Sequence, residues 1–191
     1  MFNDRSDHGS FFSNSGDAVY SEKDSDFRKI YNAVMQTLFR ISYRIVNDEE
    51  AAEDLVHDSL IKMREKKLVF PSLDDAKFWL IRVVKNASLN YAKRKVREKR
   101  AYERALREDT RKAESGEVEL LKAEAIKKTK DALDQLPENL RMVLILREYA
   151  ELNYKEIGRV LGITEGNVKV RIFRAREQLA KILGENDVYL P

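Results

Sequence analysis

The sequence predicts an all-α protein made of two small helical bundles joined by a flexible charged linker. Apolar residues recur every three or four positions in two separate blocks, roughly residues 27–95 and 119–184, which is the spacing of helices that bury one face. Glycine and proline number only 7 and 3, too few for the frequent turns of a β-sandwich or barrel. With 43% hydrophobic residues in a chain of 191, there is enough apolar material for packed cores.

The first block is expected to contain three helices. Before them, residues 1–26 are rich in Ser, Asp, Asn and Gly, and we expect a flexible arm there. The first helix begins near Phe27, and Asn47 is expected to cap the second, because three acidic residues that suit a helix N-terminus follow it. Pro71 rules out a continuous helix, so the third begins just after it and continues into a basic run over residues 93–100.

A charged linker, expected over residues 96–118, separates this block from the second, and a short tail covers residues 185–191. Within the second block, Asn153 is followed three positions later by Glu156, which is the capping-box arrangement at a helix start. A glycine-containing break follows that helix, and Thr164 is placed to cap the next one. Helix, short turn and capped helix is the helix-turn-helix pattern.

The charges suggest what this unit binds. The net charge is only +3, but residues 77–112 hold 13 basic against 4 acidic side chains, and residues 169–181 hold 5 against 1. A basic stripe on an otherwise acidic chain indicates a polyanionic partner, although a solvated helical face is the plainer alternative. The second helix of a DNA-binding helix-turn-helix enters the major groove, where lysine and arginine contact phosphates or guanine and Asn167 suits adenine. Ile172 and Phe173 are adjacent, so one of them must face inward.

Several classes of protein are disfavoured. The chain has no cysteine and only 2 histidines, so we expect no disulfide, no metal site and no cofactor. The glycines match neither of the phosphate-binding patterns GxGxxG and GxxxxGK[ST], and no nucleophile–base pair emerges, so an enzyme with catalytic residues is the least expected outcome. No apolar run suits a signal peptide or a membrane span, which leads us to expect a cytoplasmic protein without direct membrane insertion.

The two blocks resemble domains 2 and 4 of the extracytoplasmic-function (ECF) sigma factors. In the first block, residues 48–58 (DEEAAEDLVHD) and 78–86 (FWLIRVVKN) are similar to two helices of domain 2. In the second block, residues 136–144 (LPENLRMVL), 161–163 (LGI) and 166–176 (GNVKVRIFRAR) are similar to domain 4. Both blocks occur in the family's order and spacing, which is far more specific than a helix-turn-helix alone.

The resemblance implies a subunit that binds the RNA polymerase core, recognises −35 and −10 promoter elements and promotes DNA opening. It also implies an anti-sigma factor as a further partner. Together with the charge pattern it suggests these −35 contacts: Arg147, Thr164, Asn167, Lys169, Val170, Arg171, Phe173 and Arg174. The implied −10 contacts are Lys67, Leu68, Val69, Phe70 and Asn86. The implied contacts with the polymerase core are Asp54, His57 and Asp58.

Three positions depart from the family's pattern. Val170 stands where a small or polar residue is common, so we expect apolar contact there, for example with a thymine methyl group. His57 replaces a glutamine, and Asn90 stands where aspartate is frequent.

Two other functions compete with the sigma-factor interpretation. One is a sigma-like decoy or adapter that sequesters a regulator without binding DNA, which the arginines of the last helix disfavour. The other is a helix-turn-helix repressor or activator that never contacts the polymerase core. The complete first block disfavours the second alternative, because such a regulator has no need of it.

Overall fold

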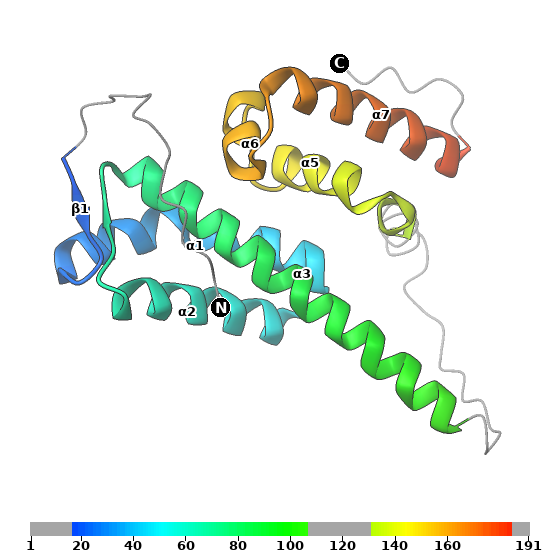
Figure 1. The fold of residues 1–191 in the computed structure, drawn as a ribbon, viewed down its shortest axis with the longest axis horizontal. Helices are drawn as coiled ribbons and strands as arrows, with labels where there is room; N and C mark the ends of the chain where they lie inside the picture. Colours follow the sequence, from blue (N-terminus) through cyan, green and yellow to red (C-terminus); the bar gives the residue numbers. More distant parts are fainter. Residues whose placement is uncertain (1–16, 107–130, 185–191) are drawn as a thin grey trace, which may run out of the picture.

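The computed structural model describes residues 17–106 and 131–184 (Figure 1). The all-α class is confirmed, because within these ranges the only strands form one two-stranded sheet. Predictions for the arm before residue 17, for the chain between 107 and 130 and for the tail from 185 lie outside the described residues. The elements are β1 (Val19–Tyr20), α1 (Asp24–Val46), α2 (Glu49–Glu65), β2 (Val69–Phe70), α3 (Leu73–Leu106), a helical turn over 131–135, α5 (Glu138–Glu148), α6 (Tyr154–Leu161) and α7 (Glu165–Leu183).

The junction between α1 and α2 differs by one residue from the prediction. Asn47 does not cap α2; it adopts the left-handed conformation (φ 55°) and ends α1, with its backbone N–H donating to the Tyr43 carbonyl. Asp48 is the cap of α2, because its carboxylate accepts from the Ala51 N–H at 3.1 Å. Asparagine tolerates the left-handed region better than most residues do, which explains why it closes one helix here instead of starting the next.

The segment just before α1 also differs from the predicted flexible arm. β1 pairs antiparallel with β2, with Val19 opposite Phe70, and both of these side chains are buried. The Ser21 hydroxyl is buried and donates to the Met63 carbonyl at 3.0 Å, while the Ser21 N–H donates to the Leu68 carbonyl at 2.9 Å. The polar composition of the first residues did not predict that this segment is ordered, because the contacts that hold it join residues about forty positions apart.

The long helix α3 extends beyond the end that the sequence suggested. Its first half is in the core of the first block, whereas its exposed second half projects away from the bundle (Figure 1). It runs to Leu106, through the first part of the stretch predicted as linker. Lysine, arginine, glutamate and alanine are good helix formers, and Arg94 pairs with Glu98 one turn later at 3.5 Å. The residues buried in its first half include Ala76, Phe78, Leu80, Ile81, Val84 and Ser88.

The second block is built around α5, which is buried along most of its length and is packed against α6 and α7. The predicted capping box at the start of α6 is confirmed: Asn153 accepts from the Glu156 N–H at 3.0 Å, and the Asn153 N–H donates to the Glu156 carboxylate at 2.8 Å. Gly162 ends α6 with a φ of 69°, and Thr164 caps α7 as predicted. The helix-turn-helix expected from the sequence is therefore present.

Candidate nucleic-acid interface

Helix α7 has a buried face and an exposed face. Val168, Ile172 and Ala175 are buried against the second block. Ile172 is 2% exposed and Phe173 is 70% exposed, so Phe173 is the member of the adjacent pair that faces solvent. The remaining outward side chains at the start of the helix include Lys169, Val170 and Arg174.

This exposed face combines apolar and cationic groups. Val170 and Phe173 lie three residues apart on one side of α7, and both are exposed. Lys169 and Arg174 flank them and are exposed as well. Cations of this kind bind phosphate oxygens, and exposed apolar side chains in a groove contact the methyl group of thymine. The arrangement is suited to reading DNA from the major groove.

The beginning of α7 is held by its own polar side chains. The Thr164 hydroxyl accepts from the Asn167 N–H at 3.3 Å. The Asn167 side-chain oxygen in turn accepts from the Arg171 guanidinium at 2.8 Å. Arg171 is half-buried and lines a small cleft of about 370 Å³ together with Glu138 and Lys85. Thr164, Asn167 and Arg171 thus form one chain of contacts beside the exposed face.

Arg147 belongs to a different helix, the last turn of α5. Its guanidinium donates to the Leu152 carbonyl at 2.9 Å and lies 5.4 Å from the centre of the Tyr154 ring. These contacts hold the turn between α5 and α6. The structure therefore places Arg147 where it positions the helix-turn-helix, with a half-buried side chain.

The second candidate surface is the loop between α2 and α3, in which some of the predicted residues are exposed and others are buried. Lys67 is exposed, has a positive φ of 49° and pairs with Glu22 at 3.6 Å. Val69 is 56% exposed. Leu68 is half-buried, and Phe70 is buried.

The inward-facing Phe70 holds this loop against α3. Its ring centre lies 5.8 Å from that of Trp79, which is half-buried against the core. Of the predicted loop residues only Lys67 and Val69 are exposed, and Asn86 on α3 is exposed as well. Phe70 thus positions the loop, and Lys67 and Val69 are the groups that a ligand meets first.

The third candidate surface is the outer face of α2. Asp54, His57 and Asp58 are all exposed, as the sequence suggested, and Asp58 lies 4.0 Å from Lys62. Ile61 extends the same stripe and is 52% exposed. Sequence reasoning missed Ile61; its signal was an isoleucine that fits none of the inward positions of this helix.

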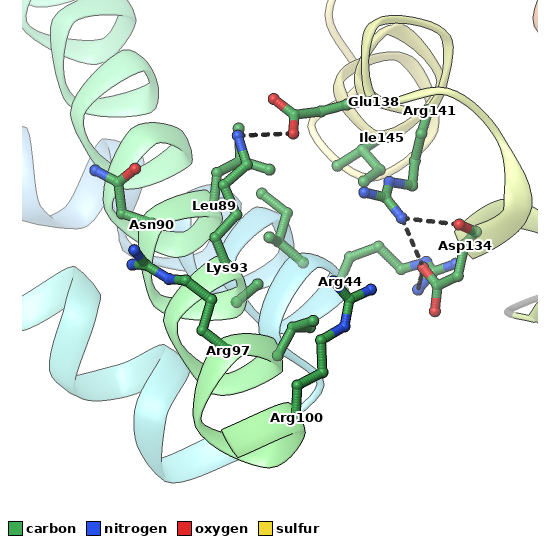
Figure 2. Close-up of a pocket in the computed structure, with 13 residues that line it drawn as sticks. Arg44, Leu89, Asn90, Lys93, Arg97, Arg100, Asp134, Glu138, Arg141 and Ile145 are labelled. Atoms are coloured by element: carbon green, nitrogen blue, oxygen red, sulfur yellow. Dashed lines mark hydrogen bonds and ion pairs between the residues drawn. The ribbon is translucent and has the colours of Figure 1, made fainter. Parts of the chain in front are cut away.

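A cationic cleft of about 750 Å³ lies between α3 and α5 (Figure 2). Arg97 and Arg100 of α3 line it, together with cations from α1 and α5. Glu138 pairs with Lys93 at 2.9 Å across the cleft, and Asp134 accepts from Arg141. Basic residues that are far apart in the sequence therefore gather at one place, with fewer acidic groups to balance them.

Other kinds of site find no support in the part of the chain that is described. Among residues 17–106 and 131–184, no group of three or more His, Cys, Asp or Glu side chains is arranged to hold a metal ion. Over the same residues, no helix combines the length and the apolar character needed to cross a membrane.

Comparison with known proteins identifies both blocks. Residues 30–98 match the family Sigma-70 region 2, and residues 127–179 match Sigma-70, region 4. The chain is 28% identical over 171 residues to the ECF RNA polymerase sigma factor SigM of Bacillus subtilis, covering 83% of this chain and 97% of that protein. It is 31% identical over 135 residues to the ECF RNA polymerase sigma-E factor of Haemophilus influenzae, covering 66% of this chain and 71% of the relative.

Solved structures share the fold. CnrH, in complex with the cytosolic domain of CnrY, is similar with a TM-score of 0.58 and 20% identity, over 87% of this chain and 93% of that one. The sigma factor RpoE of Bartonella quintana, in complex with the anti-sigma factor NepR, is similar with a TM-score of 0.54 and 22% identity, over 85% of this chain and 99% of that one. With both sigma regions matched in order, the helix-turn-helix in place and an ECF relative above 30% identity, the chain belongs to the ECF sigma factors, the subunits that direct RNA polymerase to promoters for transcription initiation.

Proposed function

We propose that this ECF sigma factor reads the −35 element with the exposed face of α7, namely Lys169, Val170, Phe173 and Arg174. One observation carries the proposal: Phe173 is a large aromatic side chain that is 70% exposed on a cation-flanked helix, where solvent alone gives it no favourable partner. Val170 and Phe173 contact base edges, and Lys169 and Arg174 contact phosphates. Thr164, Asn167 and Arg171 fix the start of α7, and Arg147 holds the turn between α5 and α6.

The exposed part of the α2–α3 loop serves the −10 element in this proposal. Lys67 attracts the backbone of a separated strand, and Val69 offers an apolar surface to an unstacked base. Asn86 adds an exposed amide on the neighbouring helix. Phe70 and Leu68 act indirectly, by holding the loop against the core.

The polymerase core binds the outer face of α2 in this proposal. Asp54, His57 and Asp58 supply charge and hydrogen-bonding groups, and the exposed Ile61 supplies an apolar contact in the same stripe. A mixed polar and apolar patch of this kind is typical of a protein–protein interface. The chain then works in the cytoplasm, where the polymerase is, as a specificity subunit that carries out no catalysis of its own.

An anti-sigma factor is the second partner that we propose. One of the two similar structures is of the sigma factor RpoE in complex with the anti-sigma factor NepR, and the other is of CnrH in complex with the cytosolic domain of CnrY. A regulator that covers the faces of α2 and α7 described above would block both polymerase and promoter.

The test is run-off transcription with bacterial core polymerase on genomic promoter fragments at fixed salt. Discrete transcripts that need this chain are expected. Replacing Phe173 with alanine removes a base contact, so promoter affinity falls by about 5- to 150-fold, which corresponds to about 1–3 kcal/mol. Replacing Arg174 with alanine removes a phosphate contact, so affinity falls on all sequences and the salt slope decreases by about 1.

A matched control lies on the same helix. Lys181 is an exposed cation in the last turn of α7, paired with Glu177 at 2.7 Å, so Lys181→Ala should leave promoter affinity unchanged. Transcripts that survive Phe173→Ala at wild-type level would contradict the role of α7. Tight core binding without any transcript would indicate an intact docking face with defective promoter reading. The absence of both transcripts and core binding would instead favour the decoy function.

A further inference from the structure

The cleft between α3 and α5 holds more positive charge than its own carboxylates neutralise. Among the described residues, five basic side chains line it against two acidic ones, which leaves three positive charges in excess. A concave site with such an excess attracts a ligand that carries several negative charges. The basic residues are Arg44 of α1, Lys93, Arg97 and Arg100 of α3, and Arg141 of α5.

Two of these arginines share one carboxylate. Asp134 accepts from the Arg141 guanidinium at 3.4 Å and lies 4.0 Å from that of Arg44, which is too long for a hydrogen bond. The Arg44 side chain is only 9% exposed, and its guanidinium lies 5.8 Å from the centre of the Tyr149 ring. A charge buried to this extent is costly unless an opposite charge compensates it. Asp134 carries one negative charge and can therefore neutralise only one of the two arginines.

Arg100 brings a third guanidinium to the same cleft. In Figure 2 its side chain extends from α3 toward Arg44. Within residues 17–106 and 131–184 it forms no ion pair or hydrogen bond. Guanidinium groups bind phosphate oxygens through pairs of N–H donors. Cations that follow a nucleic-acid backbone are arranged in a line, whereas these three arginines come from three helices to one cleft, which suits a compact chain of phosphate groups.

The same cleft has an apolar wall. Leu89, Ala92 and Val96 line it and follow one another on α3 at intervals of three and four residues, so they share one side of the helix. Val96 is exposed, and Ile45 of α1 lines the cleft as well. Small-molecule pockets combine apolar walls with a few polar groups and have volumes of ~300–1,000 Å³, a range that includes this cleft of about 750 Å³. A flat nucleobase fits such a wall.

We propose that this cleft binds a nucleoside polyphosphate, with the phosphate chain among Arg44, Arg100 and Arg141 and the base against Val96. A phosphate chain alone leaves the apolar wall without a partner, and a nucleoside alone leaves the excess of positive charge. None of the residues assigned above to promoter or polymerase contacts lines the cleft, so the site is separate from the proposed function.

Isothermal titration calorimetry of the full chain with ATP, GTP and inorganic triphosphate tests the site. Both nucleotides are expected to bind more tightly than triphosphate, because only they reach the apolar wall. Arg100→Ala is expected to weaken nucleotide binding about 10-fold or more, since it removes hydrogen bonds to a charged group. Arg94→Ala is the matched control: it removes an exposed arginine of α3 that does not line the cleft, and affinity should not change. Circular dichroism verifies that each variant keeps its helices.

Asp134→Asn is expected to act in the opposite direction. It removes the carboxylate that competes with the ligand for Arg44 and Arg141, so both nucleotides should bind more tightly. Glu98→Gln removes an exposed carboxylate of α3 outside the cleft and should bind nucleotide as the wild type does.

Duplex DNA without promoter elements, added as a competitor, separates the two sources of phosphate. Nucleotide binding that this DNA does not displace supports the site. Triphosphate binding as tight as that of the nucleotides, or an equal loss of affinity in Arg94→Ala and Arg100→Ala, overturns it. Absent nucleotide binding, with DNA affinity lowered by Arg100→Ala, assigns the cleft to nucleic acid and overturns the proposal as well. These measurements need no polymerase, so their failure leaves the proposed function untouched.

Discussion

At single positions of this protein, the identity and orientation of one residue determine which side chains are exposed and how closely the helices pack. Ile172 and Phe173 are neighbours of similar hydrophobicity, yet one is buried and the other is the most exposed large apolar side chain described. Gly158 is a second position where the side chain is decisive, because there is no room for a Cβ atom. A Cβ built there would lie 2.7 Å from the Ile163 carbonyl oxygen, so only glycine allows the turn to pack this closely on α6.

Gly158→Ala is therefore expected to destabilise the second block. The extra methyl group forces the turn outward, and overpacking of this kind costs about 1–3 kcal/mol. Gly166→Ala is the matched control, because a Cβ at that helical position meets nothing within 4 Å and alanine favours helix by up to ~1 kcal/mol. Urea denaturation followed by circular dichroism measures both changes. Equal stability of the two variants would argue against the close approach.

Asp26 makes one part of the stability pH-dependent. The Tyr20 N–H donates to its carboxylate at 3.1 Å, and this bond, with Lys29 nearby, lowers the pKa of Asp26 below its ordinary value of 3.8. Stability gained from a lowered carboxyl pKa is present above 3.8 and is lost as pH falls through the folded-state pKa. Asp26→Asn should thus lower Tm at pH 7, with the difference from wild type closing in acid. Glu53→Gln, an exposed carboxylate of α2, should show no such closing gap.

At the scale of elements, contacts between distant parts of the chain hold the loop between α2 and α3 in place. The α2–α3 loop is held by pairing of β2 with β1, by Phe70 against Trp79 and by Ser21. Each of these contacts joins a residue in or beside the loop to another part of the first block. The segment before α1 therefore acts as a support for the loop proposed to meet the −10 element.

Ser21→Ala tests this support. The substitution removes the Ser21 hydroxyl bond to the Met63 carbonyl, which keeps only the longer bond from the Leu68 N–H at 3.5 Å, and the loss of one such bond costs about 0.5–1.5 kcal/mol. We expect faster amide hydrogen exchange over residues 66–72 and weaker promoter opening, while binding to an isolated −35 duplex stays at the wild-type level. Ser25→Ala, at an exposed serine in the first turn of α1, is the control. Loop exchange that rises equally in both variants would refute the specific role of Ser21.

At the scale of the whole molecule, charged side chains are concentrated where the two blocks meet. Cations from three helices gather in the cleft between α3 and α5, and ion pairs connect the two blocks. Exposed charges of this kind interact over about 10 Å at 0.1 M salt and over about 3 Å at 1 M. Salt should therefore act on the arrangement of the blocks as well as on DNA affinity.

Dyes attached at Gln36→Cys on α1 and Gln178→Cys on α7, both exposed, report on the two blocks by energy transfer. Raising sodium chloride from about 0.05 M to about 0.5 M is expected to lower this transfer, because screening weakens the ion pairs between the blocks. Sucrose at matched osmolarity should leave transfer unchanged, which separates screening from general solvent effects. Transfer that is constant across this salt range would show that apolar contacts, and not charges, hold the blocks together.

The sequence by itself determined the helices, the helix-turn-helix, its caps and the basic last helix. Each of these follows from neighbours within a few positions: apolar spacing, the Asn153–Glu156 box, or the charge of one helical face. Only the tertiary structure decided that Phe173 faces solvent, that Phe70 turns inward and that Arg82 reaches α6. Arg82 and the Arg159 carbonyl are 77 positions apart, and no periodicity within a helix reports which distant group a side chain will meet. Such pairings depend on how whole helices pack, and packing is a property of the folded chain.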